Sequence, residues 1–182
     1  MNYAEIKKCD VANGPGIRVS LFVSGCEHYC KGCFNKEAWN FDYGKEFTAQ
    51  TLFEIKEELM KPYISGITIL GGEPMHPKNC KTVANLILYI LDNCAKSIWL
   101  YSGYTIDELE YRIHKDNKTT DEEELAENTK TILEHIDVLV DGRFEADKKD
   151  LKLRFKGSSN QRIINMNQYR LNKEIVEPKL PN

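Results

Sequence analysis

Three cysteines lie close together in this sequence, at a spacing that suits an inorganic cluster. Cys26, Cys30 and Cys33 are separated by three and two residues, with glycines at positions 25 and 32. A glycine-flanked loop lets three thiolates converge on one centre without distorting a helix or strand. Because an electron-transfer iron–sulfur cluster normally takes four cysteines, three cysteines predict a cluster with one iron open to another ligand.

The alternative is a structural zinc site in which His28 or His76 joins the three cysteines as the fourth ligand. His28 lies only two residues from both Cys26 and Cys30, which makes ligation by all three awkward in so short a loop. The remaining cysteines occur singly and are expected to be buried or incidental thiols: Cys9, Cys80 and Cys94.

A second chemical segment follows a short apolar run. Gly71 and Gly72 allow a ligand to approach the backbone closely, and the Glu73 carboxylate can accept from a cation or an amine. The glycines at positions 14 and 16 precede a predicted strand instead of following one, and no phosphate-loop lysine completes them. We therefore do not interpret them as a nucleotide site.

The elements that must position these residues alternate along the chain. Apolar and β-branched runs predict strands at residues 17–23, 67–70, 97–101, 136–140, 151–155 and 161–165, with 151–155 as an edge strand. Helical spacing and start signals predict helices at residues 48–60, 77–93 and 105–113, and a further helix opened by the acidic run 121–124.

Strands separated by helices favour an α/β fold with a mostly parallel sheet, flanking helices and right-handed crossovers. The loops that follow parallel strands share one edge of the sheet, where ligands collect. We therefore expect residues 24–35, 71–74, 102–103 and 141–143 to meet at one edge.

The composition is that of one globular domain, assigned to residues 1–182. Hydrophobic residues make up 41% and charged residues 29% of the chain, which excludes disordered and collagen-like classes. A net charge of −3 gives no overall attraction to nucleic acid or membrane, and no apolar run is long enough to span a bilayer. The charged first ten residues do not resemble an export signal, so we expect a cytoplasmic protein with reduced cysteines.

Together, these motifs resemble the radical S-adenosylmethionine superfamily, in which C-x3-C-x2-C binds a [4Fe-4S] cluster and a G-G-E-P-like segment binds the methionine part of the cofactor. Residues 13–18 (NGPGIR), 21–26 (LFVSGC) and 32–35 (GCFN) resemble the enzymes that activate glycyl-radical proteins. Residues 101–105 (YSGYT), 139–144 (LVDGRF) and 156–162 (KGSSNQR) resemble one branch, the activating proteins of anaerobic ribonucleoside-triphosphate reductase.

The resemblance implies a partial (β/α) barrel and a set of site residues. Three irons of the [4Fe-4S] cluster would be held by Cys26, Cys30 and Cys33, and S-adenosylmethionine would bind the fourth iron. Backbone around Gly32, Cys33 and Phe34 would lie beside the adenine. The methionine ammonium would be received by Gly71, Gly72 and Glu73.

The resemblance also implies a reaction and its partners. The cluster, reduced by a donor such as flavodoxin or ferredoxin, would cleave S-adenosylmethionine to methionine and a 5′-deoxyadenosyl radical. That radical would take a hydrogen from a glycine of a large reductase, at a dock walled by residues 102–103, 141–143 and 156–162. A formate-lyase-type partner is the alternative. Five residues in family-like segments have no defined role: Arg18, Asp141, Arg143, Asn160 and Arg162.

Overall fold

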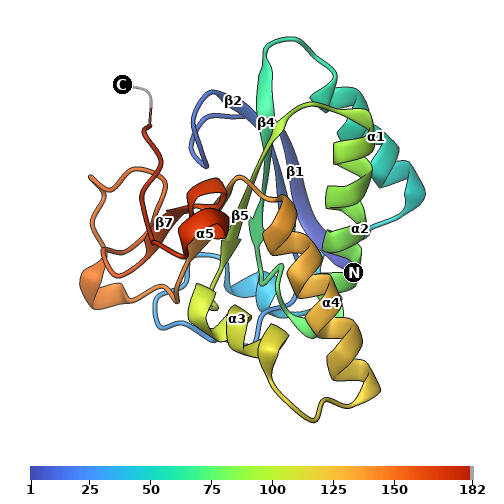
Figure 1. Ribbon diagram of the computed structural model, residues 1–182. Coiled ribbons are helices and arrows are strands. Elements are labelled where there is room, and N and C mark those ends of the chain that lie inside the picture. The colour runs from blue at the N-terminus through green and yellow to red at the C-terminus, as the bar shows by residue number, and fades with distance from the viewer. Residues whose placement is uncertain (181–182) are drawn as a thin grey trace.

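The computed structural model describes residues 1–180, which form a mixed sheet covered by helices (Figure 1). Its strands are β1 (Asn2–Asp10), β2 (Ile17–Val23), β3 (Lys45–Glu46), β4 (Ile64–Gly71), β5 (Ser97–Ser102), β6 (Val138–Asp141) and β7 (Arg162–Asn165). They lie in the order β3-β1-β2-β4-β5-β6-β7. The adjacent strands β2, β4, β5 and β6 are parallel, whereas β1, β3 and β7 pair antiparallel at the two sides.

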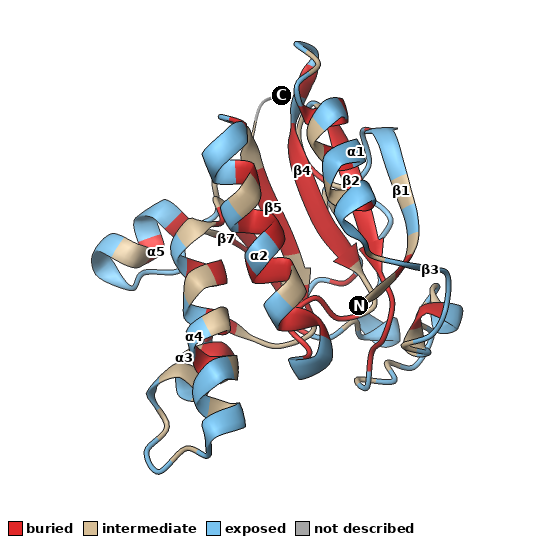
Figure 2. Ribbon diagram, turned by 90° about the vertical axis from the view of Figure 1, so that its right-hand side faces the viewer, coloured by how far each residue is buried: buried red, intermediate tan, exposed pale blue. Residues whose placement is uncertain are grey.

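The α-helices of the described chain are α1 (Ala49–Leu59), α2 (Pro77–Asn93), α3 (Ile106–His114), α4 (Thr120–His135) and α5 (Met166–Asn172). Each contributes buried side chains to one large core cluster, together with alternate residues of the strands such as Val19, Ile67 and Ile98. Figure 2 shows the central strands almost wholly buried, while the helices have one buried and one exposed face. The helices therefore cover one face of the sheet.

Threonine caps fix the starts of three of these helices. The side chains of Thr48, Thr105 and Thr119 each accept a hydrogen bond from the backbone N–H three residues further on, and each completes a capping box. Helix α2 begins with Pro77 at a position where a missing N–H costs nothing. The predicted bounds of β2 and α2 are confirmed to the residue.

The opposite face of the sheet carries a small apolar cluster that includes Trp99, and the buried Arg18 guanidinium lies over the Trp99 ring, 5.5 Å from its centroid. Arg18 donates to Thr68 Oγ1 at 2.7 Å, to the Ile67 carbonyl at 2.6 Å and to Ser97 Oγ at 3.0 Å. Burial lowers its pKa to about 10. Arg18 and Ser97 lie at the amino ends of β2 and β5, and Ile67 and Thr68 lie midway along β4, so Arg18 braces these strands away from the edge where ligands collect.

The structure departs from the sequence prediction in several places. Residues 151–155, predicted as an edge strand, form turns and bends, and β7 is the edge strand instead. The alternation there misleads because Leu151 is 90% exposed, while Phe155 has a φ of +57° and packs edge-on against Trp99 from a loop. Strands β1 and β3 and helix α5 were not expected.

The predicted parallel sheet with flanking helices is right for the four central strands. The outer strands, β1 and β3 on one side and β7 on the other, pair antiparallel. Across the described residues, β3 and β7 are the two edges of an open sheet. None of the helices in residues 1–180 is long and apolar enough to cross a membrane.

Candidate functional site

A cavity lies at the carboxyl ends of the parallel strands. Its walls include the three clustered cysteines and residues at or just after the ends of β4, β5 and β6, namely Cys26, Cys30, Cys33, Gly71, Gly72, Glu73, Ser102, Gly103 and Gly142. The predicted meeting of these loops at one edge is therefore confirmed. A larger cavity of about 510 Å³ lies between α3, α4 and α5, but no cysteine lines it.

The cysteine loop leaves β2 and enters this cavity. Cys26 is buried, and Cys30 and Cys33 are half-buried. The Cys33 N–H donates to the Cys30 carbonyl at 3.1 Å, which closes the second half of the loop. Burial raises the pKa of Cys26 to about 11 and also raises the pKa of Cys30. A metal centre bound here must therefore displace protons from these thiols.

The other cysteines are separate from the cavity, as the sequence predicts. Cys9 is exposed on β1, while Cys80 and Cys94 are buried within and directly after α2. In the part of the chain that the structure describes, no group of three or more His, Cys, Asp or Glu side chains is arranged to hold a single metal ion.

Two glycines at the end of β4, Gly71 and Gly72, bring the chain close to itself. A β-carbon on Gly72 would lie 2.6 Å from the Gly25 carbonyl oxygen, and one on Gly71 would lie 2.7 Å from the Val23 carbonyl oxygen. The Glu73 N–H donates to Gly25 O at 2.8 Å. This turn packs directly on the segment that leads into the cysteine loop. Packing of the chain therefore requires glycine at these positions, whether or not a ligand also contacts them.

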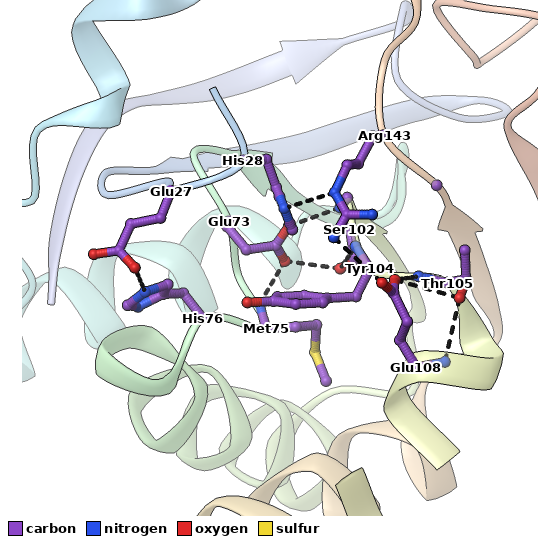
Figure 3. A network of polar contacts seen from close by, with 12 residues as sticks. Glu27, His28, Glu73, Met75, His76, Ser102, Tyr104, Thr105, Glu108 and Arg143 are labelled. Atoms are coloured by element: carbon purple, nitrogen blue, oxygen red, sulfur yellow. Dashed lines mark hydrogen bonds and ion pairs between the residues drawn. The ribbon is translucent and has the colours of Figure 1, made fainter. Parts of the chain in front are cut away.

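The Glu73 carboxylate is the centre of the polar network shown in Figure 3. Its Oε1 accepts from the Met75 N–H at 2.9 Å and from Ser102 Oγ at 2.8 Å, and Oε2 accepts from the Gly103 N–H at 2.7 Å. His28 Nε2 lies 2.8 Å from the same Oε2. With 1% of its surface exposed, Glu73 joins the ends of β4 and β5 to the cysteine loop.

The two histidines considered as zinc ligands are engaged at both ring nitrogens. His28 Nδ1 accepts from Arg143 Nε at 3.2 Å, so Nε2 carries the proton that points to Glu73. His76 Nδ1 accepts from the Lys78 N–H at 3.2 Å, and its Nε2 lies 3.2 Å from Glu27 Oε2. A Cys3His zinc site would have to break one of these contacts.

The family-like residues without a predicted role brace the loops at this edge. Asp141 is fully buried, accepts from the Ile106 N–H at 2.7 Å and from Arg162 Nε at 2.9 Å, and so ties β7 to the start of α3. Asn160 Nδ2 donates to the Arg143 carbonyl at 2.8 Å. The sequence places residues 102–103 at this edge but does not show that Ser102 donates to Glu73, that Tyr104 packs on His28 or that Glu27 pairs with His76, because each contact joins distant segments.

The fold and the site define a small α/β protein with a thiol-lined cavity at the carboxyl edge of its sheet. Residues 12–164 match the family described as a 4Fe-4S single cluster domain, which supports an iron–sulfur cofactor.

The relatives named anaerobic ribonucleoside-triphosphate reductase-activating protein include the following three. The protein of Pasteurella multocida is 38% identical over 174 residues, which is 93% of this chain and 100% of the relative. That of Enterobacteria phage T4 is 37% identical over 164 residues (90% and 93%), and that of Escherichia coli K12 is 38% identical over 164 residues (88% and 96%). The chain belongs to the family of anaerobic ribonucleoside-triphosphate reductase-activating proteins.

Proposed function

We propose that this protein activates an anaerobic ribonucleoside-triphosphate reductase by radical S-adenosylmethionine chemistry that leaves a glycyl radical on the reductase. The observation that carries the proposal is the meeting of the three-cysteine loop and the Gly71-Gly72-Glu73 turn in one cavity. The names of the relatives supply the partner, since each is a reductase-activating protein.

The residues present fit a [4Fe-4S] cluster with one open iron. Three thiols line the cavity, the other cysteines lie elsewhere, and the nearby histidine nitrogens are already engaged. Cys26, Cys30 and Cys33 would hold three irons. When bound and reduced, the cluster supplies one electron that breaks a carbon–sulfur bond of S-adenosylmethionine, releasing methionine and a 5′-deoxyadenosyl radical that takes a hydrogen atom from glycine.

The chain itself binds and orients the cofactor. We assign the adenine to the backbone around Gly32, Cys33 and Phe34, and the methionine ammonium to the turn formed by Gly71, Gly72 and Glu73. The buried Glu73 carboxylate attracts a nearby cation even while chain donors engage its oxygens, because charge interactions are strong where water is scarce. Leu70, Tyr101 and Phe144 also line the cavity and help to exclude water.

The architecture supports the same proposal. Helices cover one face of the sheet, and the cavity opens at the carboxyl ends of the parallel strands. This is the arrangement that a partial (β/α) barrel provides, with helices outside and the site at the strand ends. A small reduced protein such as flavodoxin or ferredoxin would supply the electron.

The test combines the anaerobically reconstituted protein with reductant, S-adenosylmethionine and its cognate anaerobic reductase. We expect a glycyl-radical doublet in the electron paramagnetic resonance spectrum, together with 5′-deoxyadenosine and methionine. Omitting S-adenosylmethionine is the control. A doublet that forms only on a formate-lyase-type partner would show that the partner is wrong, and a protein that binds zinc but no iron would refute the whole proposal.

The partner must deliver its glycine to this cavity, because hydrogen transfer needs the reacting atoms about 3 to 3.5 Å apart. An adjoining groove of about 370 Å³ shares Cys33 and Phe34 with the cavity and is also lined by Leu151, Leu153 and Phe155. The side chains of Phe34 and Leu151 are 89% and 90% exposed. We propose that this groove receives the glycine-bearing segment of the reductase.

Leu151→Asp is therefore expected to lower the yield of glycyl radical about tenfold and to lower cleavage of S-adenosylmethionine much less. Leu171→Asp is the matched control, since Leu171 is 80% exposed on α5 and does not line the groove. Arg162 is a poorer probe because its loss would leave the buried Asp141 without its cationic partner. Equal radical yields from the two leucine variants would contradict the assignment.

A further inference from the structure

Two reciprocal contacts join the cysteine loop to the turn after β4 (Figure 3). His28 of the loop lies 2.8 Å from Glu73 of the turn, and His76 beside the turn lies 3.2 Å from Glu27 of the loop. Each segment thus supplies one imidazole and one carboxylate. We propose that His28 is a positioning residue that holds the cysteine loop at a fixed place on the cofactor-binding turn, an inference that rests on the proposed function.

The two contacts differ in strength because they differ in burial. The side chains of His28 and Glu73 are 8% and 1% exposed, so their hydrogen bond is shielded from water. Glu27 is 57% exposed, and a contact with so exposed a carboxylate contributes little. Of these two contacts, the one made by His28 therefore contributes more to holding the loop.

The His28 ring is confined on several sides. Arg143 donates to Nδ1, and the Tyr104 ring packs edge-on with its centroid 4.5 Å away. A β-carbon on Gly103 would lie 2.3 Å from the imidazole, so this glycine leaves just enough room for the ring. The imidazole cannot shift unless β5, Arg143 or Tyr104 moves with it.

Further contacts connect Tyr104 to Met75, which follows Glu73 in the turn. The Arg112 guanidinium lies over the Tyr104 ring, 4.7 Å from its centroid, and donates to the Met75 carbonyl at 2.7 Å. Tyr104 thus lies between His28 of the cysteine loop and an arginine that holds the turn. Any change in the relative position of the loop and the turn must disturb this stack.

The hydrogen bonds of His28 indicate that this residue positions the loop and does not bind iron. A metal ligand needs a free lone pair, but His28 Nε2 carries the hydrogen that points to Glu73 and Nδ1 accepts from Arg143. By holding the loop against Glu73, His28 sets where the three thiols lie relative to the turn assigned to the methionine ammonium. Its loss is expected to weaken cofactor binding while the thiols still hold iron.

The test compares His28→Gln with His28→Asn, which carry the same amide on side chains that differ by one methylene. The amide nitrogen of glutamine lies near the position of His28 Nε2 and can donate to Glu73. The asparagine side chain is shorter, so its amide nitrogen does not reach Glu73. We expect full iron content in both variants. The Kd for S-adenosylmethionine should rise about tenfold in His28→Asn and stay within about twofold of wild type in His28→Gln.

A second readout is the spectrum of the reduced cluster. Addition of S-adenosylmethionine should change the electron paramagnetic resonance signal of His28→Gln as in wild type, and change that of His28→Asn much less. His114→Gln, at an exposed histidine on α3, is the control. Equal Kd values and equal spectra for the two His28 variants, or loss of iron from both, would overturn the inference. A wild-type protein that binds neither iron nor S-adenosylmethionine would instead refute the proposed function.

Discussion

Replacement of Cys26, Cys30 or Cys33 by alanine is expected to abolish stable incorporation of a [4Fe-4S] cluster. The three thiols line one cavity, and the nearby imidazole nitrogens are engaged by other groups, so no neighbouring side chain is placed to substitute for a lost thiolate. Anaerobic reconstitution followed by counting of iron and sulfide per chain measures the effect.

The same chain provides the controls. Cys9→Ala, Cys80→Ala and Cys94→Ala are expected to retain iron at the wild-type level, since none of these three residues lines the cavity. Full iron content in Cys30→Ala would show that the ligand set is wrong. One zinc ion and no iron in the wild-type protein would point to the structural zinc site instead.

Glu73→Gln is expected to lower the free energy of unfolding by about 3 kcal/mol. Four chain donors point at the Glu73 carboxylate, which is 1% exposed. The glutamine amide replaces an accepting oxygen by a donating nitrogen, so at least one buried donor would face another donor. Chemical denaturation of the protein before cluster reconstitution measures this loss without any contribution from bound iron.

Glu134→Gln is the matched control, because Glu134 is half exposed on α4 and lies 4.0 Å from Lys130, too far for a strong ion pair. We expect its unfolding curve to coincide with that of the wild type. A Glu73→Gln variant with the same curve would mean that the four donors do not depend on the charge of this carboxylate.

Much of the fold could be predicted because local signals agree with the tertiary structure. β2 is an apolar and β-branched run followed by Ser24 and Gly25, and α2 combines helical spacing with a proline at its first position, so both were predicted to the residue. Strand β1 was missed because four charged side chains interrupt its apolar residues. The alternation at residues 151–155 was misread because the chain there is held as a loop by contacts such as Tyr101 Oη to the Phe155 carbonyl, at 2.8 Å.

The candidate site was predictable to the extent that its chemistry lies in short motifs. The cysteine spacing indicates a cluster from residue types alone, and the alternation of strands and helices places the loops together. The partners of Glu73 could not be found in this way, since His28 and Ser102 lie 45 and 29 residues away along the chain. Close packing of the chain also requires glycine at positions 71 and 72. The sequence cannot distinguish this requirement from a role in ligand binding.

The hydrogen bonds around Glu73 have a consequence for how the protein exists before it receives iron. They are made by the chain alone, so the cysteine loop is tied to the sheet in the absence of a cluster. The conformational entropy of this loop is then lost during folding and not at the moment of cluster insertion. A small zinc module, by contrast, folds only when metal arrives. We therefore expect this chain to bind its cluster without first having to fold around it.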